Sequence, residues 1–135
     1  MRKILLVGLF VLSILVLSGC DSGGAVTGDV TYLPRIALPD DAVVTVQLQD
    51  VSLMDVAAKV LGEQVIETDG KQVPFPYDVE YDEEEIIDNH TYSMSARITD
   101  GQGNLLFISD TANLVITNGN PTSDVEIVTV PVGGA

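Results

Sequence analysis

The chain has little of three kinds of residue on which many enzymes and exported domains depend. It holds a single cysteine, Cys20, and a single histidine, His90. One cysteine cannot form a disulfide within the chain, so a folded domain must be held together by its apolar core. Basic residues are also scarce, because six lysines and arginines stand against 20 acidic residues, which gives a net charge of −14. Such a chain repels nucleic acid and anionic lipid surfaces.

Recognisable catalytic and metal-binding patterns are missing as well. The chain has no GxSxG motif, no glycine-rich phosphate loop and no CxxC pair. The acidic run 82–85 with Asp88 does not space its carboxylates as an EF-hand does, and it is interpreted as a solvated face. His90 is interpreted as a turn residue, because no nucleophile accompanies it. We therefore expect a non-enzyme with no catalytic residue, no metal site, no small-molecule substrate and no cofactor other than a covalent lipid.

That lipid is predicted from the N-terminal segment. Arg2 and Lys3 precede an apolar run over residues 4–17, and Leu17-Ser18-Gly19-Cys20 has the pattern of a lipobox. The pattern predicts that residues 1–19 are a cleaved signal peptide and that Cys20 carries the lipid. The alternatives are an uncleaved anchor, or an ordinary signal peptide in which the cysteine is incidental.

The predicted lipid would be the only attachment of the domain to a membrane. The part that follows residue 19 keeps four basic and all 20 acidic residues, a side-chain charge of −16. Residues 20–25 are predicted to be a short flexible tether, residues 26–132 the folded domain and residues 133–135 a frayed tail. The expected location is the bacterial cell envelope, on the exported, periplasmic side of a membrane. Whether that membrane is the inner or the outer one stays open.

Apolar residues alternate with a period of two after the tether, and Gly, Pro, Asp and Asn mark the breaks. We predict strands over 26–32, 42–51, 58–67, 73–81, 91–98, 105–109, 114–117 and 125–132. The segments 105–109 and 114–117 are either two short strands or one strand interrupted by residues 110–113. This pattern predicts a single all-β domain, an antiparallel Greek-key sandwich of the immunoglobulin-like or transthyretin-like kind. Pro74 and Pro76 favour a sheet edge for their strand. Tyr92 follows Asp88 by four residues, which suits either a tyrosine corner or simple core packing.

Two apolar connections are candidates for contact with a partner. If successive strands run antiparallel, residues 33–41 lie at the end of the domain far from the tether. Leu53 and Met54 then lie at the near end, about 30 Å away at roughly 3.3 Å per residue. Leu33, Arg35, Ile36 and Leu38 are predicted to form an apolar, partner-binding patch with a single positive charge. Met54 is expected to contact lipid or to have no contact. The alternative is that these residues plug the end of the sandwich.

Several segments together resemble one family, the YbaY-like lipoproteins grouped with the YscW-type lipoprotein chaperones of type III secretion. The resemblance covers nearly all of residues 26–132. It rests on the segments GDVTY (28–32), LPDDA (38–42), VQLQDV (46–51), QVPFPY (72–77), HTYSMSARI (90–98) and LLFISD (105–110). It implies a lipid-anchored, β-rich protein. The best understood members help an outer-membrane secretin to reach and assemble in the outer membrane.

Three functions are therefore compatible with the sequence. The first is a binding module or chaperone for an envelope or outer-membrane protein. The second is a structural or stress-related lipoprotein without a dedicated client. The third is an unrecognised hydrolase or metal-binding protein. An exposed apolar groove would favour the first function, and a cluster of perturbed carboxylates around His90 would favour the third.

Overall fold

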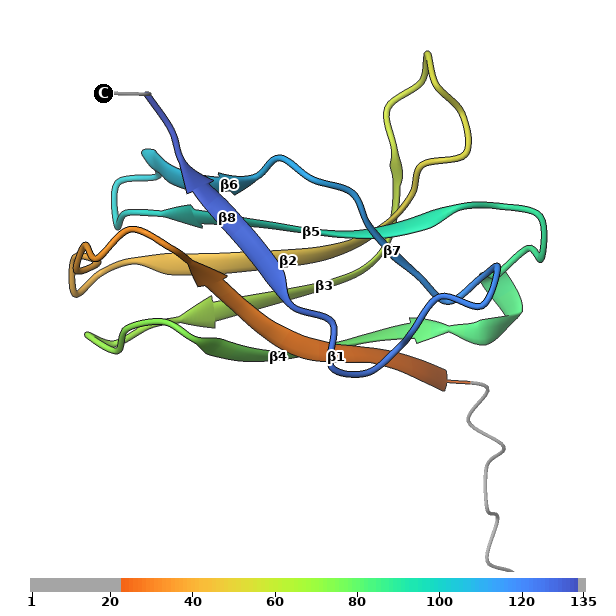
Figure 1. The fold of residues 1–135 in the computed structure, drawn as a ribbon, viewed down its shortest axis with the longest axis horizontal. Coiled ribbons are helices and arrows are strands. Elements are labelled where there is room, and N and C mark those ends of the chain that lie inside the picture. Colours follow the sequence, from red (N-terminus) through yellow and green to blue (C-terminus); the bar gives the residue numbers. More distant parts are fainter. Residues whose placement is uncertain (1–22, 134–135) are drawn as a thin grey trace, which may run out of the picture.

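The computed structural model describes residues 23–133, which form eight strands and one short 3₁₀ helix (Figure 1). The elements are β1 (Gly23–Tyr32), β2 (Val43–Asp50), β3 (Lys59–Glu67), β4 (Phe75–Asp82), η1 (Glu83–Glu85), β5 (Tyr92–Thr99), β6 (Leu105–Ser109), β7 (Asn113–Val115) and β8 (Ile127–Pro131). The predicted all-β class is confirmed, and the predicted strands match the observed ones to within a few residues. No helix within residues 23–133 is long and apolar enough to span a membrane.

All eight strands belong to one sheet, which differs from the predicted two-sheet antiparallel sandwich. The strand order is β3-β2-β5-β6-β8-β1-β4, and β7 pairs with β5 outside this path. β1 and β8 are parallel, with Val30 opposite Ile127, so the sheet is mixed rather than antiparallel. The sheet curls until its two terminal strands, β3 and β4, approach each other (Figure 1). The result is a nearly closed, barrel-like sheet.

The seam between β3 and β4 is closed by a side chain and by a close backbone approach. The backbone N–H of Asp78 donates to Oε1 of Gln64 at 2.8 Å. At Gly62 a Cβ atom would lie 2.4 Å from the carbonyl oxygen of Glu80, so only glycine allows this approach. Pro76 lies two residues before Asp78, so its backbone nitrogen points to the same side of β4, toward the seam, and carries no hydrogen to donate. The predicted edge position of the proline-bearing strand is confirmed, because β4 ends the strand order.

The core lies inside the curled sheet. In β4 every second residue is buried, and Val44, Val46 and Leu48 of β2 are fully buried, as the alternation predicts. The largest fully buried side chains also include the aromatic ring of Tyr92. Burial of a large aliphatic or aromatic side chain contributes roughly 1.5–3 kcal/mol, so this interior supplies the cohesion that no disulfide provides.

The first strand begins earlier than predicted, which shortens the tether. β1 starts at Gly23, where it pairs with Asp82 of β4, so residues 23–25 belong to the sheet. The predicted flexible tether over residues 20–25 is corrected to that extent. The predicted signal peptide, the proposed lipidation of Cys20 and residues 134–135 lie outside the described residues.

The two ends of the curled sheet carry different loops. We call the end that holds Gly23 the tether end and the opposite end the far end. The pairings make β2 run antiparallel to β1, so the chain returns to the tether end at Asp50. The segment 33–42 therefore lies at the far end and the segment 51–58 at the tether end, as predicted (Figure 1).

Candidate functional site

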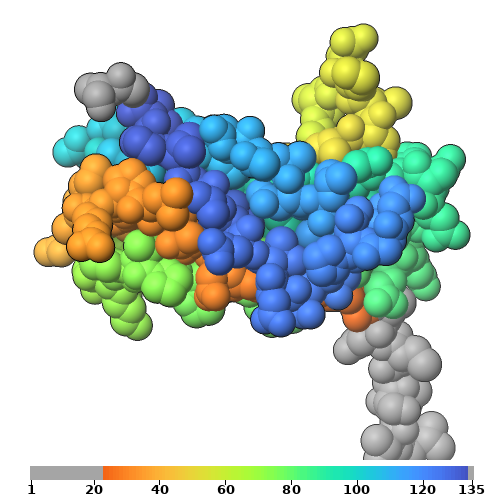
Figure 2. All heavy atoms as spheres, in the orientation of Figure 1, coloured from red at the N-terminus to blue at the C-terminus, as the bar shows by residue number. Residues whose placement is uncertain are grey.

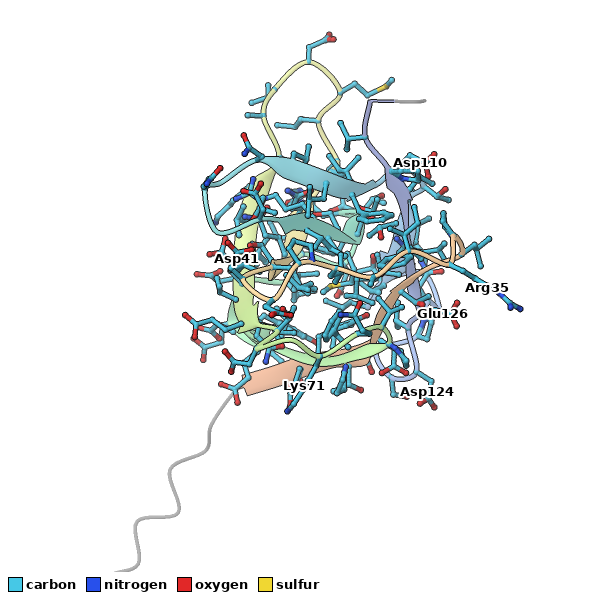
Figure 3. The ribbon with its side chains drawn as sticks, turned by 90° about the vertical axis from the view of Figure 1, so that its left-hand side faces the viewer. Arg35, Asp41, Lys71, Asp110, Asp124 and Glu126 are labelled. Carbon is cyan, nitrogen blue, oxygen red and sulfur yellow. The ribbon has the colours of Figure 1, made fainter. Side chains whose placement is uncertain are left out.

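The predicted partner-binding patch is only partly at the surface. Leu33 is 80% exposed and Ile36 is 56% exposed, and Arg35 extends away from the body (Figure 3). Leu38 is buried in the core, and its backbone N–H donates to Oε1 of Gln72 at 2.7 Å. The predicted exposure of Leu38 is therefore wrong, because this side chain plugs the far end as the alternative expected. The partner-binding role of the other three residues stays a prediction from the sequence alone, and the structure offers a second candidate surface at the opposite end.

A larger group of exposed apolar side chains lies at the tether end. The segment 51–58, which we call the 51–58 loop, connects β2 to β3 and stands out from the body (Figures 1 and 2). Leu53 is 69% exposed, Met54 96% and Val56 61%. The base of the loop is fixed, because the backbone N–H of Val51 donates to the carbonyl oxygen of Thr91 at 2.9 Å. The loop thus presents apolar side chains to solvent on an anchored stem.

A hollow of about 300 Å³ lies beside this loop. We call it the tether-end groove. Its apolar walls are Leu53, Val56 and Ala57 of the loop, Leu61 of β3 and Ile87. Its polar lining consists of Asp50, Lys59, Glu85 and His90. Ile87 is 50% exposed, so the groove offers apolar surface from segments that are far apart in the sequence.

Tyr92 holds Ile87 in place on the groove wall. The backbone N–H of Ile87 donates to the Tyr92 hydroxyl oxygen at 3.0 Å, and the Tyr92 ring is buried in the core. The predicted link from this tyrosine back to the preceding segment is present, with Ile87 as the partner rather than Asp88. A turn follows, because the backbone N–H of His90 donates to the Ile87 carbonyl oxygen at 2.9 Å. The turn position predicted for His90 is confirmed.

A polar network ties this turn to the 51–58 loop. Oδ2 of the Asp50 carboxylate lies 2.7 Å from Nδ1 of His90. Its Oδ1 accepts from the backbone N–H of Ser52 at 3.0 Å and from the Ser52 hydroxyl at 2.6 Å. The Ser52 hydroxyl oxygen in turn accepts from the backbone N–H of Thr91 at 2.8 Å. The network fixes both segments that border the groove.

This arrangement does not have the connectivity of a catalytic triad. A triad places the imidazole between the carboxylate and the hydroxyl nucleophile. Here the carboxylate of Asp50 lies between Ser52 and His90, and the serine hydroxyl donates to the carboxylate. Within residues 23–133, no three His, Cys, Asp or Glu side chains are grouped so that they could hold a metal ion. We call this network of Asp50, Ser52, His90 and Thr91 the clasp, because its hydrogen bonds join two segments of the chain.

The clasp makes one prediction about pH. Burial alone would raise the pKa of the Asp50 carboxyl, but hydrogen bonds from Ser52 and His90 outweigh burial and hold this pKa below its ordinary value. A carboxylate with a lowered folded-state pKa contributes stability above its unfolded pKa of about 4 and loses it as the pH falls through the folded value. We expect Asp50→Asn to lower the free energy of unfolding by about 1–2 kcal/mol at pH 7.

Urea unfolding at pH 7 and pH 3 checks this expectation. The gap between wild type and Asp50→Asn should be smaller at pH 3, because the carboxyl is then largely protonated in the unfolded wild-type chain and its charge-dependent contribution to stability declines. Asp124→Asn is the control, since the Asp124 side chain is exposed and lies outside the clasp. An equal gap at the two pH values would mean that the Asp50 charge does not stabilise the clasp.

The groove was not predicted from the sequence, although some of the apolar residues near it stood out there. The sequence showed Leu53 and Met54 in an apolar connection, which was expected to face lipid or nothing. Ile87 lies in an acidic segment and gave no sign of a binding role. Only the fold brings Leu53 and Ile87 to one hollow.

Known proteins resemble this chain over most of its length. The protein family described as type III secretion system lipoprotein chaperone (YscW) matches residues 22–127 of this chain. The uncharacterized lipoprotein YbaY of Escherichia coli (strain K12) is 39% identical over 105 residues, which make up 78% of this chain and 55% of that protein. This chain thus spans about half the length of that relative.

A solved structure also resembles the fold. The alternative pilotin from the type II secretion system of Vibrio cholerae matches with a TM-score of 0.78 and 46% sequence identity, over 83% of this chain and 99% of that chain. The sequence resemblance and the fold resemblance agree, and they confirm the family predicted from the sequence. The chain therefore belongs to the YscW family of lipoprotein chaperones and, within it, is similar to YbaY.

Proposed function

We propose that this protein is a lipid-anchored, non-enzymatic chaperone of the cell envelope that binds a protein client in the tether-end groove. The observation that carries the proposal is the exposed apolar surface of Leu53, Met54 and Val56 beside the hollow. A folded domain rarely leaves a contiguous apolar patch in water unless something binds there. The matched family, described as secretion-system chaperones, supports a protein client.

The proposed anchor would hold the groove close to a membrane. β1 begins at Gly23, so only Asp21 and Ser22 separate the sheet from Cys20. Three Cα–Cα steps of 3.8 Å span at most about 11 Å. A lipid on Cys20 would therefore keep the tether end at the bilayer surface, where an exported client first meets it.

The proposal can be tested in cells that lack the protein. We expect one or a few envelope proteins to lose their normal membrane location, as measured by quantitative proteomics of separated membranes. Wild type should restore that location. Cys20→Ser should not, because a serine cannot take the lipid and the domain then leaves the membrane.

Two outcomes would contradict the proposal. Membrane-bound, processed Cys20→Ser protein would disprove the anchor. An envelope proteome that is unchanged by deletion would favour the second function, a structural lipoprotein without a dedicated client.

A further inference from the structure

The groove itself restricts which kind of client segment could bind. Its walls are formed by Leu53, Val56, Leu61 and Ile87, with Ala57 beside them. Such walls favour apolar side chains as occupants, because these leave water on binding and satisfy no polar group. Apolar walls alone do not distinguish between a protein segment, a lipid chain and a second copy of this domain. The charges around the hollow make that distinction.

The border of the groove is acidic. Glu85 lines the hollow, and exposed Glu83 and Glu84 precede it in η1. Asp88 follows Ile87 directly, and Asp55 lies on the 51–58 loop between the apolar side chains. All five carboxylates are exposed. Each of them is a lining residue of the hollow or lies at most two positions from one in the sequence. With a Debye length of about 8 Å at physiological salt, their charges favour cations at the border and disfavour anions.

Few basic residues counter this field at the tether end. Lys59 lines the groove and is exposed. Arg97 lies near the far end of β5, two residues before its last residue Thr99, and Arg35 and Lys71 lie in far-end connections. Asp50 is the carboxylate that the clasp engages with His90. The border therefore has an excess of negative charge beside the apolar walls of the groove.

We propose that the groove binds an apolar segment of the client that carries lysine or arginine beside its apolar side chains. This inference rests on the proposed function and specifies its partner. The acidic border draws the basic residues in, and the apolar side chains then fill the hollow between the 51–58 loop and Ile87. A bilayer is the less favoured occupant, because the acidic border repels anionic headgroups and a fatty chain would leave that border without a partner.

The test uses designed peptides and the mature chain from residue 20, with Cys20→Ser so that no lipid is attached. Three fluorescent helical peptides of equal length share one scaffold. The first has leucines on one face and lysines beside them, the second has the same leucines with glutamates, and the third has serines in place of the leucines with the lysines kept. Fluorescence anisotropy measures each dissociation constant. We expect the leucine–lysine peptide to bind at least tenfold more tightly than either of the others.

Matched variants then locate the binding. Val56→Asp should weaken binding of the leucine–lysine peptide at least tenfold, whereas Leu33→Asp at the far end should leave it unchanged. The triple variant Glu83→Gln, Glu84→Gln, Glu85→Gln should weaken binding and flatten its salt dependence. The control removes the same number of charges at the far end, with Asp40→Asn, Glu67→Gln and Asp69→Asn, and should bind as wild type does.

Equal affinity for the lysine and glutamate peptides, or equal effects of the two triple variants, would overturn the inference. Flotation with vesicles that contain anionic lipid tests the bilayer, and groove-dependent binding to these vesicles would also overturn it. A client found in cells that lack the protein, together with no preference for the lysine peptide, would leave the proposed function in place and remove only this inference.

Discussion

Gly28→Ala is expected to lower the free energy of unfolding by more than about 4 kcal/mol, which is a large share of the roughly 5–15 kcal/mol that stabilises a typical domain. A Cβ atom at this position would lie 1.9 Å from the carbonyl oxygen of Val125 and 2.5 Å from its carbonyl carbon. Both are backbone atoms, so no side-chain rotation can relieve the clash. The segment that leads into β8 crosses β1 here and would have to move away.

That segment cannot move cheaply, because several hydrogen bonds hold it against β1 and β4. The backbone N–H of Val125 donates to the carbonyl oxygen of Thr27 at 3.0 Å. The backbone N–H of Thr27 donates to the carbonyl oxygen of Thr122 at 2.9 Å. The Tyr77 hydroxyl donates to the Val125 carbonyl oxygen at 2.6 Å, and burial raises the pKa of this tyrosine. Displacing Val125 would leave these buried groups without partners.

The control lies in the same strand and carries the same substitution. Gly23→Ala introduces a Cβ that has no atom within 4 Å beyond its own residue and its two chain neighbours, so the free energy of unfolding should stay within about 0.5 kcal/mol of wild type. Urea unfolding followed by circular dichroism compares the two variants. Equal midpoints for Gly28→Ala and Gly23→Ala would show that the crossing at Val125 is looser than the structure has it.

Local patterns in the sequence predicted the strands but not their arrangement. Alternating burial in β4 follows directly from the alternation of Phe75, Tyr77, Val79 and Tyr81, since side chains of a strand point to opposite faces. The parallel pairing of Val30 with Ile127 joins residues almost a hundred positions apart, and nothing near either residue indicates it. The sandwich was therefore inferred where a single curled sheet forms.

The candidate site could be predicted to a smaller extent. The chain direction was sufficient to place Leu53 and Met54 at the tether end, because β1 and β2 run antiparallel as expected of successive strands. Whether an apolar residue in a connection is exposed depends on its neighbours in space, which is why Leu38 and Leu53 could not be told apart. The contact between His90 and Asp50 also joins distant segments, and no spacing in the sequence indicates it.

A photo-crosslinker at Met54 is expected to form an adduct with one envelope protein, whereas the same group at Ile36 is expected to form none. Met54 is 96% exposed on the 51–58 loop, next in sequence to Leu53, which lines the groove in which the client is proposed to lie. Val56→Asp in the same chain should reduce the adduct at least tenfold. A carboxylate introduced into the apolar wall loses its water when the client binds, which costs more than about 1.4 kcal/mol.

This measurement, made with the lipidated protein in its own envelope, tests the central claim most directly. The account predicts one protein adduct from Met54, its loss with Val56→Asp, and its persistence with Leu33→Asp, an equally charged change at the far end. Capture of a protein from Ile36 but not from Met54 would contradict the account, because the client would then bind at the far end and leave the groove empty.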